Sequence, residues 1–233
     1  DVKDRDAFAA AIDSIFRSLH GEVDVAGHAL RIQASAGAVL ARAGNAAVDA
    51  MIVRADLALY KAKESGKNGW QLFEDAMDRA FRDRQVMKAH LRQAIDGEEL
   101  RVVYQPIVSM QTMRIASCEA LCRWDHPELG QVSPAVFIPL AEEMGIISAI
   151  SALMLKTATA ECAKWPEPVC VSVNLSAKDF RNDDIIARVR ESLAASGLDP
   201  ARLEIEVTET ALLDDTTQMR RCLEELKSPG VRI

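Results

Sequence analysis

The sequence has few aromatic residues, no long apolar run and no excess of positive charge. Aromatic residues make up 5% of the 233 positions. No stretch reaches the roughly 18 to 20 apolar residues that cross a bilayer, and the first residues lack the apolar core of a signal peptide. The formal net charge of -7 excludes a broad nucleic-acid footprint, because phosphate binding requires clustered Lys and Arg. We therefore expect a cytoplasmic chain that is neither membrane-spanning nor secreted, with no nucleic-acid polymer as its partner.

A disulfide framework is also missing. The five cysteines contain no CxxC pair, and their odd number fits free thiols in a reducing compartment. The residues that are present, 49% hydrophobic and 27% charged, are those of a globular protein with enough apolar material for packed cores. The chain begins without Met and ends abruptly at Ile233. We expect it to be a piece of a longer protein, in which a sensor or membrane anchor can lie upstream.

The first third of the chain mixes helix and strand signals. Its predicted elements are a helix over 5–20, a hairpin of strands 23–25 and 29–40, and a helix over 46–65. Gly27 marks the hairpin turn and Gly66 the end of the second helix. The densely charged residues 73–95 predict a helix with a large solvated surface, which we expect to connect two domains.

From residue 100 onward, strand-like runs alternate with helical segments. The predicted strands are 100–109, 115–124, 169–176 and 202–209. The predicted helices start at Ser133-Pro134 and cover 147–164, 183–196 and 216–226. This alternation indicates a parallel α/β sheet or barrel.

Three of these strands carry oxygen-bearing side chains on one face. Strand alternation puts Glu119 on one face of its strand, Ser172 with Asn174 on one face of the next, and Glu204 with Glu206 on the last. Carboxylate and amide oxygens suit Mg²⁺ or Mn²⁺, and the carboxyl ends of barrel strands are where such sites form. A lone Glu in a strand more often lies on the solvent face of a half-exposed sheet. The pattern alone therefore leaves both interpretations open and names no substrate.

Five blocks of residues follow one another along this second half. They are Tyr104-Gln105-Pro106-Ile107; Glu119-Ala120-Leu121 with Arg123-Trp124-x-His126-Pro127; Ser133-Pro134-x-x-Phe137-Ile138-Pro139-Leu140-Ala141-Glu142; Ser172-Val173-Asn174-Leu175-Ser176; and Glu206-Val207-Thr208-Glu209. Together and in this order they resemble the first half of an EAL-type cyclic-di-GMP phosphodiesterase domain. The resemblance implies a modified (β/α)8 TIM-like barrel that hydrolyses cyclic di-GMP to linear pGpG with two divalent cations, Mg²⁺ or Mn²⁺.

The resemblance also implies a role for individual residues. The positions that match the family's metal ligands are Glu119, Asn174 and Glu206, with Glu119 also catalytic. The positions that match its nucleotide contacts are Gln105, Leu121 and Arg123, with Arg123 facing a phosphate. Glu209 matches a catalytic-loop residue that braces the loop beside the metal site. We assign His126 a structural role, because no second His or Cys stands at ligand spacing.

A second resemblance covers the start of the chain. The residues Ala55-Asp56-x-Ala58-Leu59-Tyr60-x-Ala62-Lys63-x-x-Gly66-Lys67-Asn68 resemble the C-terminal part of a GGDEF domain, an α+β nucleotidyl-cyclase-like fold. Lys63 and Lys67 would then reach GTP, although a solvated helix end explains them equally well. The predicted organisation is a partial GGDEF-like domain over 1–75, a connector helix over 76–98 and a partial EAL domain over 99–233.

Both resemblances lack parts on which activity depends. The Gly-Gly-Asp/Glu-Glu-Phe turn is absent, so cyclase activity from this chain is excluded. The EAL match stops after Val231-Arg232-Ile233, where the family has an Asp-Asp-Phe-Gly-Thr-Gly block. We expect the chain alone to be inactive and the complete protein to be a phosphodiesterase, with a non-catalytic cyclic-di-GMP receptor as the alternative. We also expect a homodimer through EAL domains, since half a barrel exposes unpaired strand edges.

Overall fold

The computed structural model describes residues 3–19, 22–31, 33–41, 47–66, 68–97, 99–181, 184–207 and 217–233. The chain divides into two compact units, Asp1–Val86 and Met87–Ile233. The division falls within helix α3 (Asp75–Asp96), which the sequence predicts as a connecting helix over 73–95. None of the helices in these ranges has the length and apolar character needed to span a membrane.

The first unit begins with helix α1 (Arg5–Leu19), which confirms the predicted first helix. A hairpin of β1 (Glu22–Val25) and β2 (His28–Arg31) follows, with antiparallel pairing. Its turn residues Ala26 and Gly27 have φ of 54° and 83°, the left-handed values that a tight two-residue hairpin turn requires. The hairpin is confirmed, but its second strand is shorter than the predicted 29–40 run.

The rest of that run belongs to a different sheet. Strand β3 (Ala36–Ala38) pairs in parallel with β4 (Trp70–Leu72), which the sequence analysis did not predict. Helix α2 (Val48–Glu64) packs directly on β3. A Cβ added to Gly37 would lie 1.9 Å from the backbone oxygen of Ala55, so only glycine lets the helix approach this closely.

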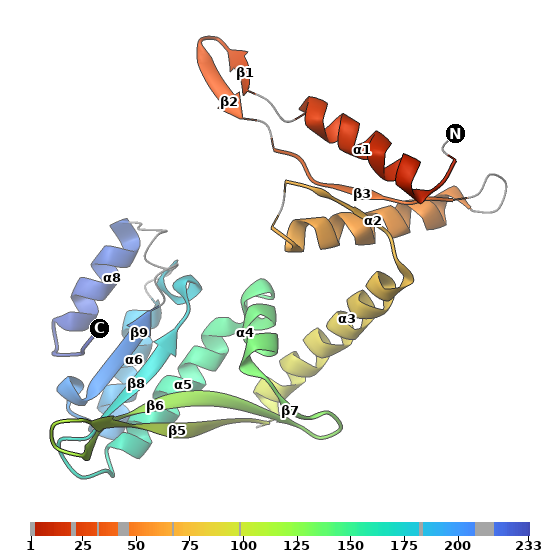
Figure 1. Cartoon of the computed structure of the whole chain (residues 1–233). Coiled ribbons are helices and arrows are strands. Elements are labelled where there is room, and N and C mark those ends of the chain that lie inside the picture. The colour runs from red at the N-terminus through yellow and green to blue at the C-terminus, as the bar shows by residue number, and fades with distance from the viewer. Residues whose placement is uncertain are drawn as a thin grey trace. The chain divides into compact units, whose positions relative to one another are not determined.

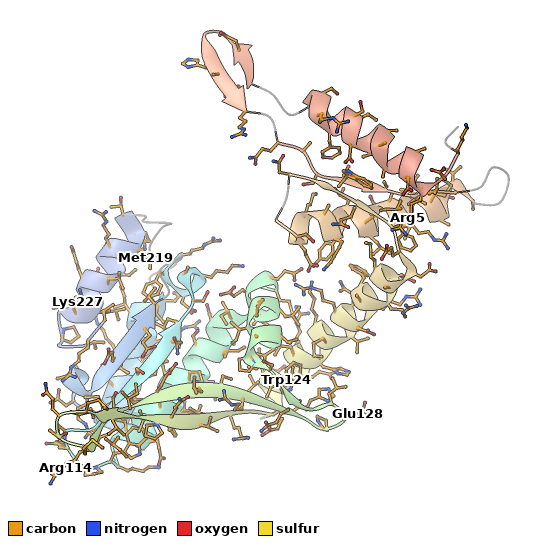
Figure 2. The ribbon with its side chains drawn as sticks, in the orientation of Figure 1. Arg5, Arg114, Trp124, Glu128, Met219 and Lys227 are labelled. Atoms are coloured by element: carbon orange, nitrogen blue, oxygen red, sulfur yellow. The ribbon has the colours of Figure 1, made fainter. Side chains whose placement is uncertain are left out.

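The second unit is built on one five-stranded sheet with the order β5-β6-β8-β9 and β7 beside β6. Its strands are β5 (Leu100–Ser109), β6 (Arg114–His126), β7 (Gly130–Val132), β8 (Cys170–Leu175) and β9 (Leu203–Val207). Figure 2 labels Arg114, the first residue of β6, and Trp124, which lies two residues before its end. Strands β6, β8 and β9 are parallel, which confirms the prediction of a parallel α/β sheet for this part of the chain.

Strand β5 departs from the parallel arrangement of the sheet. This strand runs antiparallel to β6 because residues 110–113 join the two in a hairpin, which a parallel pair cannot use. Strand β7 also pairs antiparallel to β6. Past β9, Arg232 forms a parallel bridge with Glu204, and the two backbone hydrogen bonds that make it measure 2.9 and 3.0 Å.

Helices cover one face of this sheet, and Figure 1 shows α5 and α6 alongside β8 and β9. The helices are α4 (Pro134–Glu143), α5 (Ile147–Cys162), α6 (Asp184–Ser196) and α8 (Thr217–Lys227), with short 3-10 turns η1 (Ala177–Arg181) and η2 (Pro200–Arg202). Ser133 precedes α4 as predicted, but its side chain makes no capping hydrogen bond. Trp124 is fully buried in the core, and its ring packs edge-on against the ring of Phe137, with 5.8 Å between the two ring centroids.

Candidate active site

The register of the sheet brings the predicted polar residues to one face. Glu119 on β6 pairs with Gln105 on β5 and with Ser172 on β8. One step toward the carboxyl ends, Asn174 on β8 pairs with Glu206 on β9. Because paired residues on neighbouring strands point to the same side, these side chains share the face opposite the helices.

Two of the predicted metal ligands touch. The amide Nδ2 of Asn174 donates a hydrogen bond of 2.8 Å to Oε1 of Glu119. Glu119 and Glu206 are half-buried, while Asn174 is exposed at the end of its strand. The alternation seen in the sequence accounts for this placement, since Val171 and Val173 occupy the opposite face of β8 and are fully buried.

A cleft of about 480 Å³ lies between the second half of β6, the end of β8 and helices α4 and α5, and of the two residues in this contact Asn174 lines it. Leu121, Arg123 and Asn174 line it, so three of the predicted site residues share one cavity. The guanidinium of Arg123 is half-buried, and its Nη1 donates to the backbone oxygen of Cys122 at 2.9 Å. Apolar residues of α4 and α5, among them Ile138 and Met154, form the remaining wall. A cleft with a cationic rim and an apolar wall suits a ligand with phosphates and flat bases.

The residues after β8 are held by a hydrogen-bond network that the sequence analysis did not single out. Ser176 Oγ donates to Glu142 Oε1 at 2.6 Å, and the Ser176 backbone N–H donates to Asp179 Oδ2 at 3.1 Å. Asp179 is buried and also accepts from Ser148 and Ser151. The quoted sequence blocks contain Ser176 and Glu142, but only their packing reveals that they meet. The network fixes the end of β8, where Asn174 lies.

The chemistry of the donor set fits a hard divalent cation. Two carboxylates and one amide supply oxygen ligands of the kind that Mg²⁺ and Mn²⁺ prefer. Ser172, on the same face, is buried, and its Oγ has no hydrogen-bond partner among the described residues. In the described parts of the chain, no three His, Cys, Asp or Glu side chains are close enough together to hold a metal ion by themselves. Glu119, Asn174 and Glu206 therefore offer part of a coordination shell.

Other predicted site residues lie outside the lining of the cleft or outside the described ranges. Gln105 is exposed on β5, next to Glu119 in the register. Lys63 is exposed on α2. Glu209 and Lys67 lie outside the described residues, so their predicted roles stay predictions.

His126 is buried and has a histidine neighbour that its sequence spacing did not reveal. Its Nδ1 accepts from the backbone N–H groups of Glu128 and Leu129, at 3.0 and 3.1 Å. The proton therefore sits on Nε2, which lies 2.6 Å from Nδ1 of His90 on α3. His90 therefore lies beside His126 in space although it does not stand at ligand spacing in the sequence, and these contacts agree with a structural role for His126.

The cysteines near the site are poor nucleophiles. Burial raises the pKa of Cys122 to about 11, and burial also raises the pKa of Cys118. Both thiols are thus protonated near neutral pH, and a thiolate mechanism is excluded for them. The chemistry available at this face is that of carboxylates, an amide and Arg123.

Comparison with known proteins decides the family. Residues 88–233 match the EAL domain family, which is more than half of the chain. The chain belongs to the EAL domain family. Residues 1–69 match the family described as diguanylate cyclase, GGDEF domain, so a partial GGDEF domain precedes the EAL domain. The tandem resemblance found in the sequence is confirmed.

Two curated relatives and one solved structure illustrate the likeness. Protein y4lL of Sinorhizobium fredii is 42% identical over 89% of this chain and 25% of its own length. The bifunctional diguanylate cyclase/cyclic di-GMP phosphodiesterase MucR of Pseudomonas aeruginosa is 31% identical over 97% of this chain and 33% of its own length. The chain therefore spans a quarter to a third of these relatives.

The solved structure supports the barrel assignment. The PaMucR phosphodiesterase in complex with c-di-GMP is 34% identical and superposes with a TM-score of 0.60, over 63% of this chain and 61% of that chain. The EAL domain described here is thus part of a TIM-like α/β barrel, with β6, β8 and β9 as consecutive parallel strands. The predicted fold class is confirmed.

Proposed function

We propose that the complete protein is a cyclic-di-GMP phosphodiesterase that hydrolyses cyclic di-GMP to linear pGpG, and that residues 1–233 alone are inactive. The observation that carries this proposal is the contact of Asn174 with Glu119 beside a cleft that Arg123 lines. A cluster of carboxylates and an amide can hold divalent metal ions, and the guanidinium of Arg123 can bind a phosphate. This combination suits phosphodiester hydrolysis, in which negative charge develops on the phosphoryl oxygens.

The residues divide the work by their chemistry. Arg123 binds a phosphate of the ligand and orients it, and Leu121 contacts a base in the cleft. Glu119, Asn174 and Glu206 would hold divalent cations, Mg²⁺ or Mn²⁺, as part of a larger set of ligands. When bound, such cations supply an activated water and stabilise charge on the phosphoryl group. Gln105 contacts the nucleotide from β5, and Glu209 braces the adjoining loop.

Further predictions concern the rest of the protein. We propose a functional division into a partial GGDEF domain over 1–75, a connector over 76–98 and a partial EAL domain over 99–233. We also predict that the first part binds GTP and acts as a regulator. A homodimer through EAL domains is a further prediction.

Two variants test the proposal in the protein extended through the rest of its EAL domain. The Glu119→Gln variant should lose turnover to pGpG while it still binds cyclic di-GMP, because the substitution removes a ligand charge and leaves the cleft intact. The Arg123→Ala variant should weaken cyclic-di-GMP affinity roughly 10- to 100-fold, the loss expected for a charge-assisted phosphate contact. Chromatography measures the product and calorimetry measures the affinity. Tight binding with no turnover by the unmodified protein would instead select the receptor alternative.

A further inference from the structure

Ser172 lies on the polar face of the sheet, but its hydroxyl makes no hydrogen bond to any described residue. The residue is 1% exposed. The hydroxyls of Ser148 and Ser151, in contrast, both donate to Asp179. A buried hydroxyl without a partner costs about 1–3 kcal/mol, so its presence calls for an explanation in another state of the protein.

The neighbours of Ser172 in the sheet are two carboxylates. In the register, Ser172 pairs with Glu119 on β6 and with Glu204 on β9. Adjacent strands lie about 4.8 Å apart, and paired side chains point to the same face. A serine hydroxyl in this position is therefore within reach of either carboxylate after a change of rotamer.

The contact between Asn174 and Glu119 must change when both residues bind a cation. In the structure Asn174 offers its Nδ2 to Glu119 Oε1 at 2.8 Å. An amide binds a cation through Oδ1 and never through its NH₂ group. Turning Oδ1 toward a shared cation moves Nδ2 away, so Glu119 loses this donor at the moment when its orientation matters most.

We propose that Ser172 is a positioning residue that takes over as the hydrogen-bond donor to Glu119 when Glu119 and Asn174 hold a divalent cation. The inference rests on the proposed metal site. The Ser172 hydroxyl, on the strand next to that of Glu119, is a donor without a partner among the described residues. A carboxylate that is held in one orientation by a hydrogen bond binds a cation better than a mobile one. The cost of the unpaired hydroxyl in the metal-free protein is then offset in the metal-bound protein.

Affinity for Mn²⁺ and stability in its absence test this role together. Calorimetry on the protein extended through its EAL domain should show Mn²⁺ affinity about tenfold lower for Ser172→Ala, at the lower end of the effect of removing such partners. Ser172→Thr, which keeps the hydroxyl, should retain most of the affinity. In EDTA, the urea midpoint of Ser172→Ala should equal or exceed that of the unmodified protein, because the variant removes an unpaired polar group.

The outcomes separate this inference from the proposed function. Equal Mn²⁺ affinity of Ser172→Ala and the unmodified protein overturns the role of Ser172 and leaves the phosphodiesterase proposal standing. If Ser172→Ala and Glu204→Gln both lose stability clearly in EDTA, the hydroxyl forms a structural hydrogen bond with Glu204. That result also overturns the proposed role of Ser172. If Glu119→Gln does not change Mn²⁺ binding, the metal site itself is wrong, and both proposals fall.

Discussion

Asn174 on β8 and Glu119 on β6 are joined by a hydrogen bond of 2.8 Å from amide Nδ2 to carboxylate Oε1. The two residues are 55 positions apart in the sequence, and the parallel pairing of their strands brings them together. The amide lies on β8, the strand between those that carry Glu119 and Glu206, and Glu206 is the register partner of Asn174. This neutral group between two acids should matter most when no cation is bound.

Replacing the amide with a third acid tests this relationship. The Asn174→Asp variant loses the donor to Glu119 and adds a like charge, so in EDTA its free energy of unfolding should fall by about 1 kcal/mol. Millimolar Mn²⁺ should restore more stability to this variant than to the unmodified protein, because the cation neutralises the added charge. Urea unfolding with and without Mn²⁺ measures both effects. Equal stability of the two proteins in EDTA would contradict the account.

Gly37 should tolerate no side chain. The Cβ of a Gly37→Ala variant would meet backbone atoms of Ala55 and Leu59 at 1.9 and 2.2 Å, so α2 must move off β3. We expect a loss of about 2 kcal/mol or more from the stability of the first unit. Gly69→Ala is the matched control, because nothing lies within 4 Å of its added Cβ, and it should change stability by less than about 1 kcal/mol. Thermal unfolding compares the two, and a neutral Gly37→Ala would show that the close approach is absent.

Tyr104 should make the second unit sensitive to alkali. Burial is the main cause that raises its pKa to about 12, from 10.0 for the exposed side chain. Below pH 10 both states keep the proton, and stability is full. As the pH rises from 10 toward 12, the unfolded state ionises first, so stability falls.

The Tyr104→Phe variant isolates this effect. Its loss of stability near pH 7 should be small, since the hydrogen bond that the phenol donates to the Thr157 carbonyl is long at 3.5 Å. Relative to the unmodified protein, the variant should be more stable at pH 11 than at pH 7. Urea unfolding at the two pH values gives the difference, and a constant difference between variant and unmodified protein would refute the assignment.

The parts of the fold that depend on local pattern could be predicted from the sequence. Strand β5 was expected at residues 100–109 and is found there, because a β-favouring run bounded by turn residues needs no distant partner. The shared polar face of Glu119, Asn174 and Glu206 also followed from alternation together with parallel pairing. Family motifs then named the chemistry that alternation left open.

The parts of the fold that depend on partners distant in the sequence could not be predicted from local pattern. Strands β3 and β4 are three residues each and pair across 34 positions, so neither has a periodic signal of its own. Arg202 donates to the carbonyl oxygens of Val169, Cys162 and Trp165, a contact that no spacing reveals. The bond of Ser176 to Glu142 and the pairing of His90 with His126 are likewise products of packing.

The most direct test of the central claim is the rate of pGpG formation from cyclic di-GMP, measured by chromatography in parallel for residues 1–233 and for the protein extended through its EAL domain. With Mn²⁺ present, the extended protein should turn over the substrate, excess EDTA should stop it, and residues 1–233 should give no product above the buffer blank. Robust turnover by residues 1–233, or none by the extended protein with Mn²⁺, would contradict the account.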